Sequence, residues 1–455
     1  MANPKFPYAT AAEFSAAAGR MGLDLPVSED VTILARPIRI GRREAANRLV
    51  VHPMEGCDAG PDGGPTDLTF RRYERWAGGG AGLVWFEACA VVHEGRSKPR
   101  QLYINEQSVA GFAELVRRTR AAAPAGVRPL LVLQLTHSGR YSRPAGQLTP
   151  VIAQHCPELD EYVKIGPDYP LISDAELDAL QDTYARAAAL AAQAGFDAVD
   201  VKACHCYLLN ELLGARTRPG RYGGDYANRT RFQRETAAKV RAAVGGQAEI
   251  VSRLNVYDGL PYPYGWGVAE AALPPPADGG YHPPGPDLAE PIRLVRELVD
   301  AGLSCLSVTV GNPRYRPHFN RPYDGGAVDP PPPEPALVGV ARLVDLTRQV
   351  QQACPELPVI GAGLSWPRQW FPQLGAAIVR NGWAGMVGLG RGALAYPDFA
   401  LDIVRHGRLE ESKVCVICGG CTQLMRDGGP VGCIVRDRSV YGPIYQAARQ
   451  RAAKA

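Results

Sequence analysis

Eight short apolar segments recur along this chain, and most are separated by longer stretches rich in Ala, Leu and Arg. The segments cover residues 48–53, 81–86, 129–134, 198–201, 249–254, 305–308, 358–361 and 385–388. Strands that are apolar throughout belong to a parallel sheet buried on both faces, with helices as the connections. The count of eight predicts an α/β fold closed as a (β/α)8 TIM barrel. In such a barrel the chemistry lies at the C-terminal ends of the strands.

The length of the chain predicts more than a barrel alone. With 455 residues it exceeds what a minimal barrel needs. We predict an N-terminal extension over residues 1–44, with a short helix at 11–21, then a barrel over 45–405. A cysteine-rich segment and a tail follow over 406–455. Hydrophobic residues make up 46% and charged residues 21%, as in ordinary soluble proteins.

Charge and composition exclude several classes of partner. The formal net charge of +4 is spread along the sequence, without a basic run or a basic stripe interleaved with aromatic residues, so nucleic acid is not expected. No segment approaches about 18 uninterrupted apolar residues, and the N-terminus lacks the apolar core of a signal peptide, so no membrane span is expected. Eleven cysteines, an odd number without such a signal, favour a reducing, cytoplasmic location over a disulfide framework.

Four of the cysteines cluster near the C-terminus, in the pattern Cys415-x2-Cys418-x2-Cys421-x11-Cys433. Four thiolates within 19 residues, three of them tightly spaced, suit a [4Fe–4S] cluster. A zinc site with four cysteine ligands is the alternative, although zinc sites more often show two Cys-x2-Cys pairs. The pattern therefore predicts these four residues as metal ligands, with iron–sulfur favoured.

Polar residues follow the fourth apolar segment, namely Lys202, His205 and Tyr207. Taken alone, this spacing is also compatible with a solvated loop after a strand. A second motif lies downstream and reads Tyr222-Gly-Gly-Asp-Tyr-Ala-Asn-Arg-Thr-Arg-Phe232. Together the two motifs resemble the old yellow enzyme family of FMN-dependent ene-reductases, in the branch of 2,4-dienoyl-CoA reductase and trimethylamine dehydrogenase. Two positions depart from the family pattern, because Lys202 stands where a first His is usual and Cys206 replaces a Gly.

The resemblance implies an FMN site at the strand ends, and matching motifs follow the first, third, fifth, seventh and eighth predicted strands. By this resemblance Gln134 bonds the pyrimidine edge of the flavin, Arg253 stabilises negative charge on the reduced ring, and Arg391 binds the phosphate. Glycine-rich turns after the last two strands are a usual phosphate site in barrels. The implied cofactor-binding residues are Pro53, Met54, Ala88, Gln134, Arg253, Gly361, Gly363, Gly390 and Arg391.

The resemblance also implies catalytic roles for the residues after the fourth strand. Tyr207 is the expected proton donor, because a phenol with an ordinary pKa near 10 is protonated at neutral pH. His205, with Lys202 or alone, is expected to bind the activating carbonyl. Lys202 has several roles open to it: a cationic clamp on an enolate, a base, a Schiff-base amine, or a group that points away from the substrate.

The sequence also predicts which loops shape the pocket and where the electrons come from. Three long loops, over residues 141–171, 255–286 and 311–335, follow predicted strands and are expected to shape the pocket. No Gly-x-Gly-x-x-Gly motif follows a strand, so no dinucleotide-binding domain is expected in this chain. In the resembled branch two more domains follow the cluster, whereas 22 residues follow Cys433 here. We therefore expect a separate redox partner protein, with NAD(P)H as a further transient donor, and a homo-oligomer.

The expected reaction is the reduction of a C=C bond conjugated to a carbonyl or thioester in a small-molecule substrate. Two alternatives stay open. An amine or alicyclic dehydrogenase of the same fold could hold a cationic amine in an aromatic cage, for which the candidates are Trp85, Trp266, Trp366 and Trp383. A zinc-stabilised, non-catalytic barrel would carry zinc and no flavin.

Overall fold

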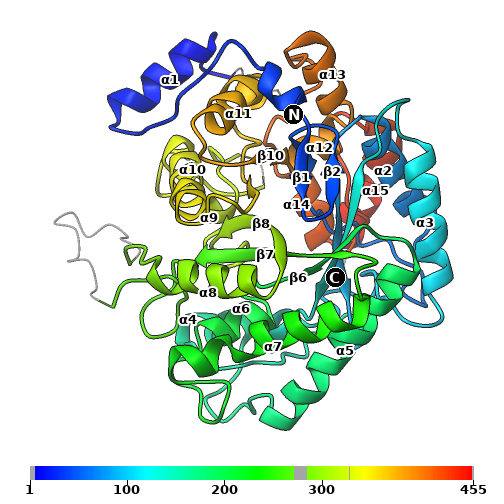
Figure 1. Ribbon diagram of the computed structural model, residues 1–455, viewed down its shortest axis with the longest axis vertical. Helices are drawn as coiled ribbons and strands as arrows, with labels where there is room; N and C mark the ends of the chain where they lie inside the picture. Colours follow the sequence, from blue (N-terminus) through cyan, green and yellow to red (C-terminus); the bar gives the residue numbers. More distant parts are fainter. Residues whose placement is uncertain (1–5, 271–283, 327, 453–455) are drawn as a thin grey trace.

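The computed structural model describes residues 6–270, 284–326 and 328–452. Eight parallel strands form a closed barrel in the order β10-β3-β4-β5-β6-β7-β8-β9 (Figure 1). Their bounds are β3 Leu49–Val51, β4 Leu83–Ala90, β5 Leu130–Thr136, β6 Ala198–Val201, β7 Glu249–Tyr257, β8 Leu303–Val310, β9 Val359–Gly361 and β10 Met386–Leu389. The (β/α)8 barrel expected from the sequence is confirmed.

Each of the eight apolar segments forms one barrel strand. Four strands run two or more residues further at their C-terminal ends than the apolar pattern predicts: β4, β5, β7 and β8 continue to Ala90, Thr136, Tyr257 and Val310. Polar residues such as Asn255 interrupt the apolar run there, so hydrophobicity alone ends these strands too early. The extra residues carry the strands up to the end of the barrel where the site lies.

Alternation along the strands separates an apolar interior from a polar end. Val132 of β5 and Val251 of β7 belong to one buried cluster inside the barrel. Two residues further along come Gln134 and Arg253, which face the same interior because side chains in a strand alternate with a period of two. The core therefore fills the lower barrel, and polar groups collect at the C-terminal ends.

Helices surround the strands (Figure 1). One longer helix follows each strand in turn: α2 Asp67–Gly78, α3 Val109–Ala121, α5 Asp174–Gln193, α7 Tyr226–Val244, α8 Ala289–Asp300, α10 Ala336–Ala353, α11 Phe371–Arg380 and α13 Phe399–His406. The shorter helices are α4 Pro157–Val163, α6 Leu208–Leu213, α9 Pro317–Asn320 and α12 Arg391–Ala395, with 3₁₀ turns η1 Thr32–Ala35, η2 Gly139–Tyr141 and η3 Arg368–Trp370. A capping box between Ser173 and Glu176 begins α5.

The N-terminal segment closes the end of the barrel at which the strands begin, here called the lower end; the upper end is the one at which the strands finish. It contains helix α1 (Ala11–Arg20) and an antiparallel hairpin of β1 (Ile38–Ile40) and β2 (Arg43–Ala45). Ile40 and Ala45 join the apolar cluster inside the barrel. The boundary predicted between residues 44 and 45 therefore falls within β2, and the domain limits stay a prediction.

Two of the three long loops are fully or almost fully described. The loop at 141–171 contains α4, and the loop at 311–335 contains α9. In the loop at 255–286, the first residues belong to β7, and residues 271–283 lie outside the described part of the chain. Within the described residues, no helix is both long enough and apolar enough to span a membrane.

The cysteine-rich segment packs against the upper loops of the barrel. It includes α14 (Gly420–Arg426) and is followed by α15 (Arg438–Ala452). The backbone N of Val431 donates to the carbonyl of Gly56 at 2.7 Å, beside the end of β3. Arg426 forms an ion pair with Asp329 of the loop after β8 at 2.8 Å. These contacts place the segment at the C-terminal end of the barrel.

Candidate active site

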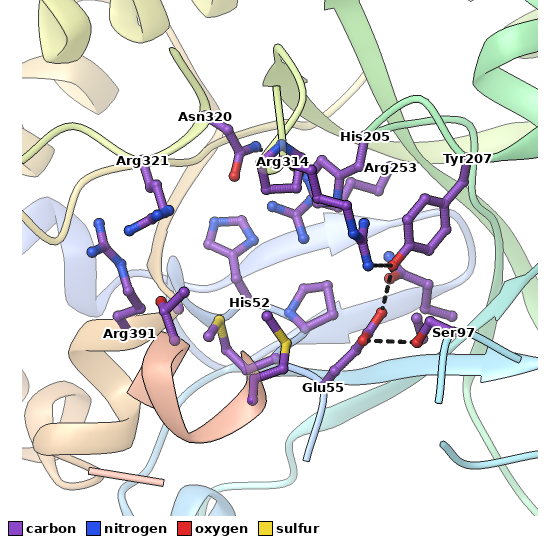
Figure 2. A pocket seen from close by; sticks show the side chains of 18 of the residues that line it. His52, Glu55, Ser97, His205, Tyr207, Arg253, Arg314, Asn320, Arg321 and Arg391 are labelled. Atoms are coloured by element: carbon purple, nitrogen blue, oxygen red, sulfur yellow. Dashed lines mark hydrogen bonds between the residues drawn. The ribbon is translucent and has the colours of Figure 1, made fainter. Parts of the chain in front are cut away.

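A cavity of about 350 Å³ lies at the C-terminal ends of the strands (Figure 2). The ends of β3 to β7 and the loops that follow the strands line it, and the cysteine-rich segment contributes Thr422 and Met425. The charge of the lining is one-sided: among the described residues it has one carboxylate, that of Glu55, against eight cationic side chains. These are Lys98, Arg143, Lys202, Arg253, Arg314, Arg321, Arg391 and Arg426.

The structure brings the residues expected from the sequence into this one cavity. The three expected catalytic residues Lys202, His205 and Tyr207 line it, together with eight of the nine expected cofactor-binding residues: Pro53, Met54, Ala88, Gln134, Arg253, Gly363, Gly390 and Arg391. Gly361 lies behind the lining, where its carbonyl accepts a hydrogen bond from His52 Nε2 at 3.1 Å. His52 itself lines the cavity.

A buried carboxylate, Asp200 of β6, connects the floor of the cavity. Its Oδ2 accepts from Gln134 Nε2 at 2.6 Å and from Trp85 Nε1 at 3.0 Å. Its Oδ1 accepts from the backbone N of Arg253 at 2.8 Å. Burial raises the pKa of Asp200 to about 6, although these donors and the nearby Lys202 oppose the rise. The carboxylate thereby fixes Gln134 and the end of β7 relative to each other.

His205 is held as a neutral hydrogen-bond donor. Its Nε2 lies 3.1 Å from the side-chain Nδ2 of Asn320. Because the amide nitrogen donates, the hydrogen-bond network assigns the imidazole proton to Nδ1. Burial, together with Arg253 and other nearby cations, holds the pKa of His205 well below its ordinary value. The imidazole is therefore uncharged and has one N–H to offer.

The turn that carries His205 has an unusual backbone. His205 and Cys206 have φ values of +66° and +52°, in the left-handed region that favours glycine. The side-chain oxygen of Asn210 accepts from the backbone N of Cys206 at 2.7 Å and stabilises the turn. This strained conformation accompanies the placement of His205 and Tyr207 in the cavity wall.

Tyr207 lies within a chain of hydrogen bonds (Figure 2). Its hydroxyl donates to Glu55 Oε1 at 3.1 Å and accepts from Arg314 Nη2 at 3.4 Å. Ser97 Oγ donates to the other oxygen of Glu55 at 3.1 Å. Burial raises the pKa of Tyr207 above its ordinary value, and Arg314 opposes the rise. Lys202 Nζ lies 4.0 Å from the centre of the Tyr207 ring, so Lys202 points towards the proposed proton donor.

Two arginines lie at the other side of the cavity, Arg321 and Arg391 (Figure 2). Arg321 Nη2 and Arg391 Nη1 are buried and have no hydrogen-bond partner within the described residues. Gly390 precedes Arg391, and a Cβ atom there would lie 3.0 Å from Met54 Sδ. Buried guanidinium N–H groups beside close-packed glycine turns form a site for an anion.

The four expected metal ligands line a second, smaller cavity. Cys415, Cys418, Cys421 and Cys433 surround it, and Arg391 lines both cavities. The backbone N of residue 417 donates to Cys415 Sγ at 3.5 Å, and that of residue 436 to Cys433 Sγ at 3.3 Å. Across the described ranges, no three His, Cys, Asp or Glu residues are grouped closely enough for a single metal ion. The thiols thus share a cavity but are spread around it.

The four tryptophans considered for an aromatic cage lie elsewhere in the fold. Trp85 and Trp266 are fully buried in apolar clusters. Trp366 packs edge-on against Phe6 of the N-terminal segment, with ring centres 5.2 Å apart, and Trp383 lies beside a guanidinium of α10. The observed cavity therefore gives no support to a tryptophan cage for a cationic amine.

Comparison with known proteins settles the family. The model of the NADH:flavin oxidoreductase / NADH oxidase family matches residues 34–266, just over half of the chain. The chain belongs to this oxidoreductase family. The metal reductase of Desulforamulus reducens is 26% identical over 411 residues, which cover 89% of this chain and 53% of that protein. The NADH oxidase of Thermoanaerobacter brockii is 26% identical over 419 residues, covering 90% and 57%.

Solved structures agree on the fold. A 2-naphthoyl-CoA reductase superposes with a TM-score of 0.70 at 20% identity, over 90% of this chain and 57% of that chain. At this identity the likeness shows the barrel architecture. The chain spans about half the length of the curated relatives it matches first.

The cavity fits the flavin that this family implies. Its volume of about 350 Å³ is in the range of cofactor sites. Buried donors without a partner in the described chain face it at two places, at Arg321 and Arg391 and at the Nε of Arg253. A phosphate would satisfy the first pair, and the polar edge of a flavin ring the other. The donor set therefore suits FMN in this family member.

Among the cavity residues that sequence reasoning missed are His52, Arg314, Asn320 and Arg321. Three of them, Arg314, Asn320 and Arg321, lie in the loop after β8, which was expected to shape the pocket. His52 had a signal, because it follows Val50 by two positions on the same strand face. No signal in the sequence marked Asn320, since its contact with His205 joins residues 115 positions apart.

Proposed function

We propose that this chain is an FMN- and [4Fe–4S]-dependent ene-reductase, which reduces a C=C bond conjugated to a carbonyl or thioester. One observation carries the proposal: a neutral hydrogen-bond donor, His205, and a protonated phenol, Tyr207, line the same cavity. The centres of the two rings are 6.4 Å apart. When bound, FMN supplies the hydride for the β-carbon.

The side chains of the cavity divide the remaining work. His205 binds the carbonyl oxygen through Nδ1–H, and Lys202 adds positive charge to this part of the site as negative charge grows on the oxygen. Tyr207 gives its proton to the α-carbon. Arg314, at 3.4 Å from the phenol oxygen, stabilises the phenolate that remains until solvent returns the proton. The chain thus supplies the proton and the stabilising charge.

For the flavin, we assign the phosphate to the side with buried, unsatisfied guanidinium groups. Arg391, Gly363 and Gly390 would hold it there. Gln134 and Arg253 would bond the ring, since both extend from strand ends that Asp200 fixes in place. Apolar contacts would come from Pro53, Met54 and Ala88, and Gly361 acts through its hydrogen bond to His52.

For the second cavity, we assign a [4Fe–4S] cluster to Cys415, Cys418, Cys421 and Cys433, with single-electron transfer as its chemistry. Thiolates that bind one zinc ion all lie about 2.3 Å from it. Four thiols that line one cavity, three of them closely spaced in the sequence, support a cluster ligated by all four. Arg391 lines this cavity and the larger one, so the two sites are neighbours.

The electrons would come from NAD(P)H or from a separate redox protein. Relatives named NADH oxidase and NADPH dehydrogenase support the nucleotide. The cysteine site supports a protein partner, because a one-electron carrier needs a one-electron donor or acceptor. A cytoplasmic location and a homo-oligomeric state remain predictions.

An anaerobic absorption spectrum of the pure protein, with iron, zinc and released flavin quantified, tests the cofactors first. FMN and about four irons per chain are expected, and Cys418→Ala should lose the iron while keeping the flavin. Reduction of 2-cyclohexenone by the photoreduced protein then tests the reaction. Zinc without flavin would favour the non-catalytic barrel, and bleaching of the flavin by an amine would favour an amine dehydrogenase.

A further inference from the structure

The cations of the large cavity fall into two groups. Arg321 and Arg391 lie at one side, and Arg314 lies with Tyr207 at the other (Figure 2). Lys98 and Arg143 line the same cavity as Arg314. Burial lowers the pKa of Lys98, and so do the positive charges of Arg143 and Arg314. The phosphate of the flavin uses the first group in the function proposed above. The second group, Arg314, Lys98 and Arg143, has no phosphate to bind, and within it only Arg314 has a role in the proposed reaction.

Arg314 is fixed in place but forms no direct ion pair with a carboxylate among the described residues. Its guanidinium carbon lies 4.2 Å from the centre of the Tyr141 ring and 5.3 Å from that of Tyr207. Its charged group makes a weak hydrogen bond of 3.4 Å to the Tyr207 hydroxyl. The ion pairs of the described residues include no carboxylate partner for it. Stacking therefore holds the guanidinium in the cavity wall, where it can also bind an anion of the substrate.

Among the residues that the structure describes, the one carboxylate near this group is Glu55, whose charge raises the pKa of Arg314 and of Lys98. Glu55 already accepts one hydrogen bond at each oxygen, from Tyr207 and from Ser97, both at 3.1 Å. Lys98 Nζ donates to the main-chain carbonyl of Met425 at 2.9 Å, which is a neutral acceptor. One carboxylate of the described residues thus faces three cations, so positive charge is in excess at this wall of the cavity, and a second anion would be attracted there.

We propose that Arg314, with Lys98 and Arg143, forms the binding site for a carboxylate carried by the substrate. This inference rests on the proposed ene-reductase function and narrows its substrate class. Because Arg314 contacts the hydroxyl of the proton donor, the carboxylate lies only a few bonds from the carbon that Tyr207 protonates. The substrate is thus an unsaturated carbonyl compound with a nearby carboxylate, and a neutral enone is a poor substitute.

Binding of an unreactive pair of ligands tests the site without any turnover. The protein with its cofactors is titrated calorimetrically with 4-oxopentanoate and with its methyl ester, which lacks the charge. The acid should bind more tightly to the wild type. Arg314→Gln should weaken the acid by about 10- to 100-fold, the effect of losing a charged hydrogen-bond partner, and leave the ester unchanged. Arg314→Lys should keep part of the preference for the acid over the ester, because lysine has the same charge but lacks the paired N–H donors of the guanidinium.

Matched variants separate this site from general charge effects and from misfolding. Arg316→Gln removes a cation from the same loop, where Arg316 donates to the carbonyl of Gly259 at 3.1 Å outside the cavity lining. It should leave both affinities unchanged. Arg143→Gln alters a partly exposed residue and should weaken the acid by about 3-fold, as expected for a screened charge. It tests the proposal even where Arg314→Gln fails to fold.

Turnover gives the second arm, with (E)-4-oxopent-2-enoate and its methyl ester. The ester is chemically the more electron-poor alkene, so a higher kcat/KM for the acid has to come from binding. Equal affinity of the wild type for acid and ester, or equal losses for both in Arg314→Gln, would overturn the proposal. The proposal would also be overturned if Arg314→Gln no longer bound ADP-ribose but still bound 4-oxopentanoate as tightly as the wild type does. That result would assign the cations to the phosphates of a nucleotide.

The two arms also distinguish this proposal from the function on which it rests. Arg314-dependent binding of 4-oxopentanoate without reduction of either alkene would uphold the carboxylate site and remove the ene-reductase. Reduction of 2-cyclohexenone without any preference for an acid over its ester would uphold the ene-reductase and remove the carboxylate site.

Discussion

The two ends of the barrel treat charge in opposite ways. At the lower end, Asp197 accepts from Arg43, Arg120 and Arg128, each at 3.0 Å, and from the backbone N of Leu131 at 2.9 Å. One buried carboxylate there satisfies three arginines. At the upper end, eight cationic side chains and one carboxylate of the described chain line a cavity. The lower end pairs its charges within the fold. At the upper end Arg321 and Arg426 share Asp329, and the other six cations have no ion pair among the described residues, at the end where barrel enzymes in general bind their ligands.

The comparison predicts that a change at the upper end alters the reaction and leaves the fold intact. Tyr207→Phe should slow reduction of an enone by about 100-fold or more, the contribution of a general acid. Flavin content and thermal stability should stay near those of the wild type. Single-turnover rates with photoreduced protein measure the effect. Tyr162→Phe alters another tyrosine of the same cavity lining and should keep the rate. Equal rates for Tyr207→Phe and the wild type would remove Tyr207 from the mechanism.

A change at the lower end should do the opposite. Asp197→Asn leaves three arginines without their carboxylate, and we expect a loss of about 2 to 3 kcal/mol in the free energy of unfolding, reduced from the fully buried case because the arginines are partly solvated. The enone reduction rate should not change. Urea unfolding measures the loss. Asp182→Asn removes a surface pair with Lys239 and should cost less than about 0.5 kcal/mol. A slower reaction in Asp197→Asn would contradict the division between the two ends.

Asp200 lies between the two ends, and because its carboxyl is buried we expect the stability of the protein to depend on pH. Burial raises its pKa in the folded protein to about 6, against about 3.9 in an unfolded chain. A carboxyl whose folded pKa is raised costs stability once it is ionised, so the cost is absent below about pH 4 and complete above about pH 6. It amounts to about 2 to 3 kcal/mol. Glu87 and Asp258 also have raised pKa values, of about 7 and about 6. Urea unfolding at several pH values should therefore show a decline in both proteins that is smaller in Asp200→Asn by the cost of ionising Asp200. Parallel pH profiles of the two proteins would refute the assignment.

Sequence patterns predicted the lower, apolar part of the barrel better than its upper rim. Eight apolar segments marked the eight strands, and motifs after those strands marked residues such as Gln134 and Arg253. Their side chains meet because every strand of a parallel barrel ends on the same side. The family motif also carried His205 and Tyr207 into the same cavity. Local sequence is sufficient where the strand geometry itself decides which residues meet.

The features that the sequence did not predict depend on contacts between distant parts of the chain. The hairpin of β1 and β2 closes the barrel through Ile40 and Ala45, yet each strand has three residues and no clear alternation. Arg314 and Asn320 lie in a loop rich in Pro and Arg, where no period relates a residue to the cavity. Their roles follow only from tertiary packing, which brings that loop over the end of β6.

The smallest expected effect concerns Asn320, because it acts on the substrate only through the imidazole of His205. Asn320→Ala removes the donor to Nε2, so the proton is no longer held on Nδ1, and enone reduction should slow by about 10-fold, the value of one hydrogen bond. Asn320→Asp places an acceptor there instead, which draws the proton to Nε2 and should slow the reaction further. Nitrogen-15 spectra of the imidazole report the tautomer independently of the rate. A loss caused by packing alone would make alanine the worse variant, whereas control of the tautomer makes aspartate the worse one.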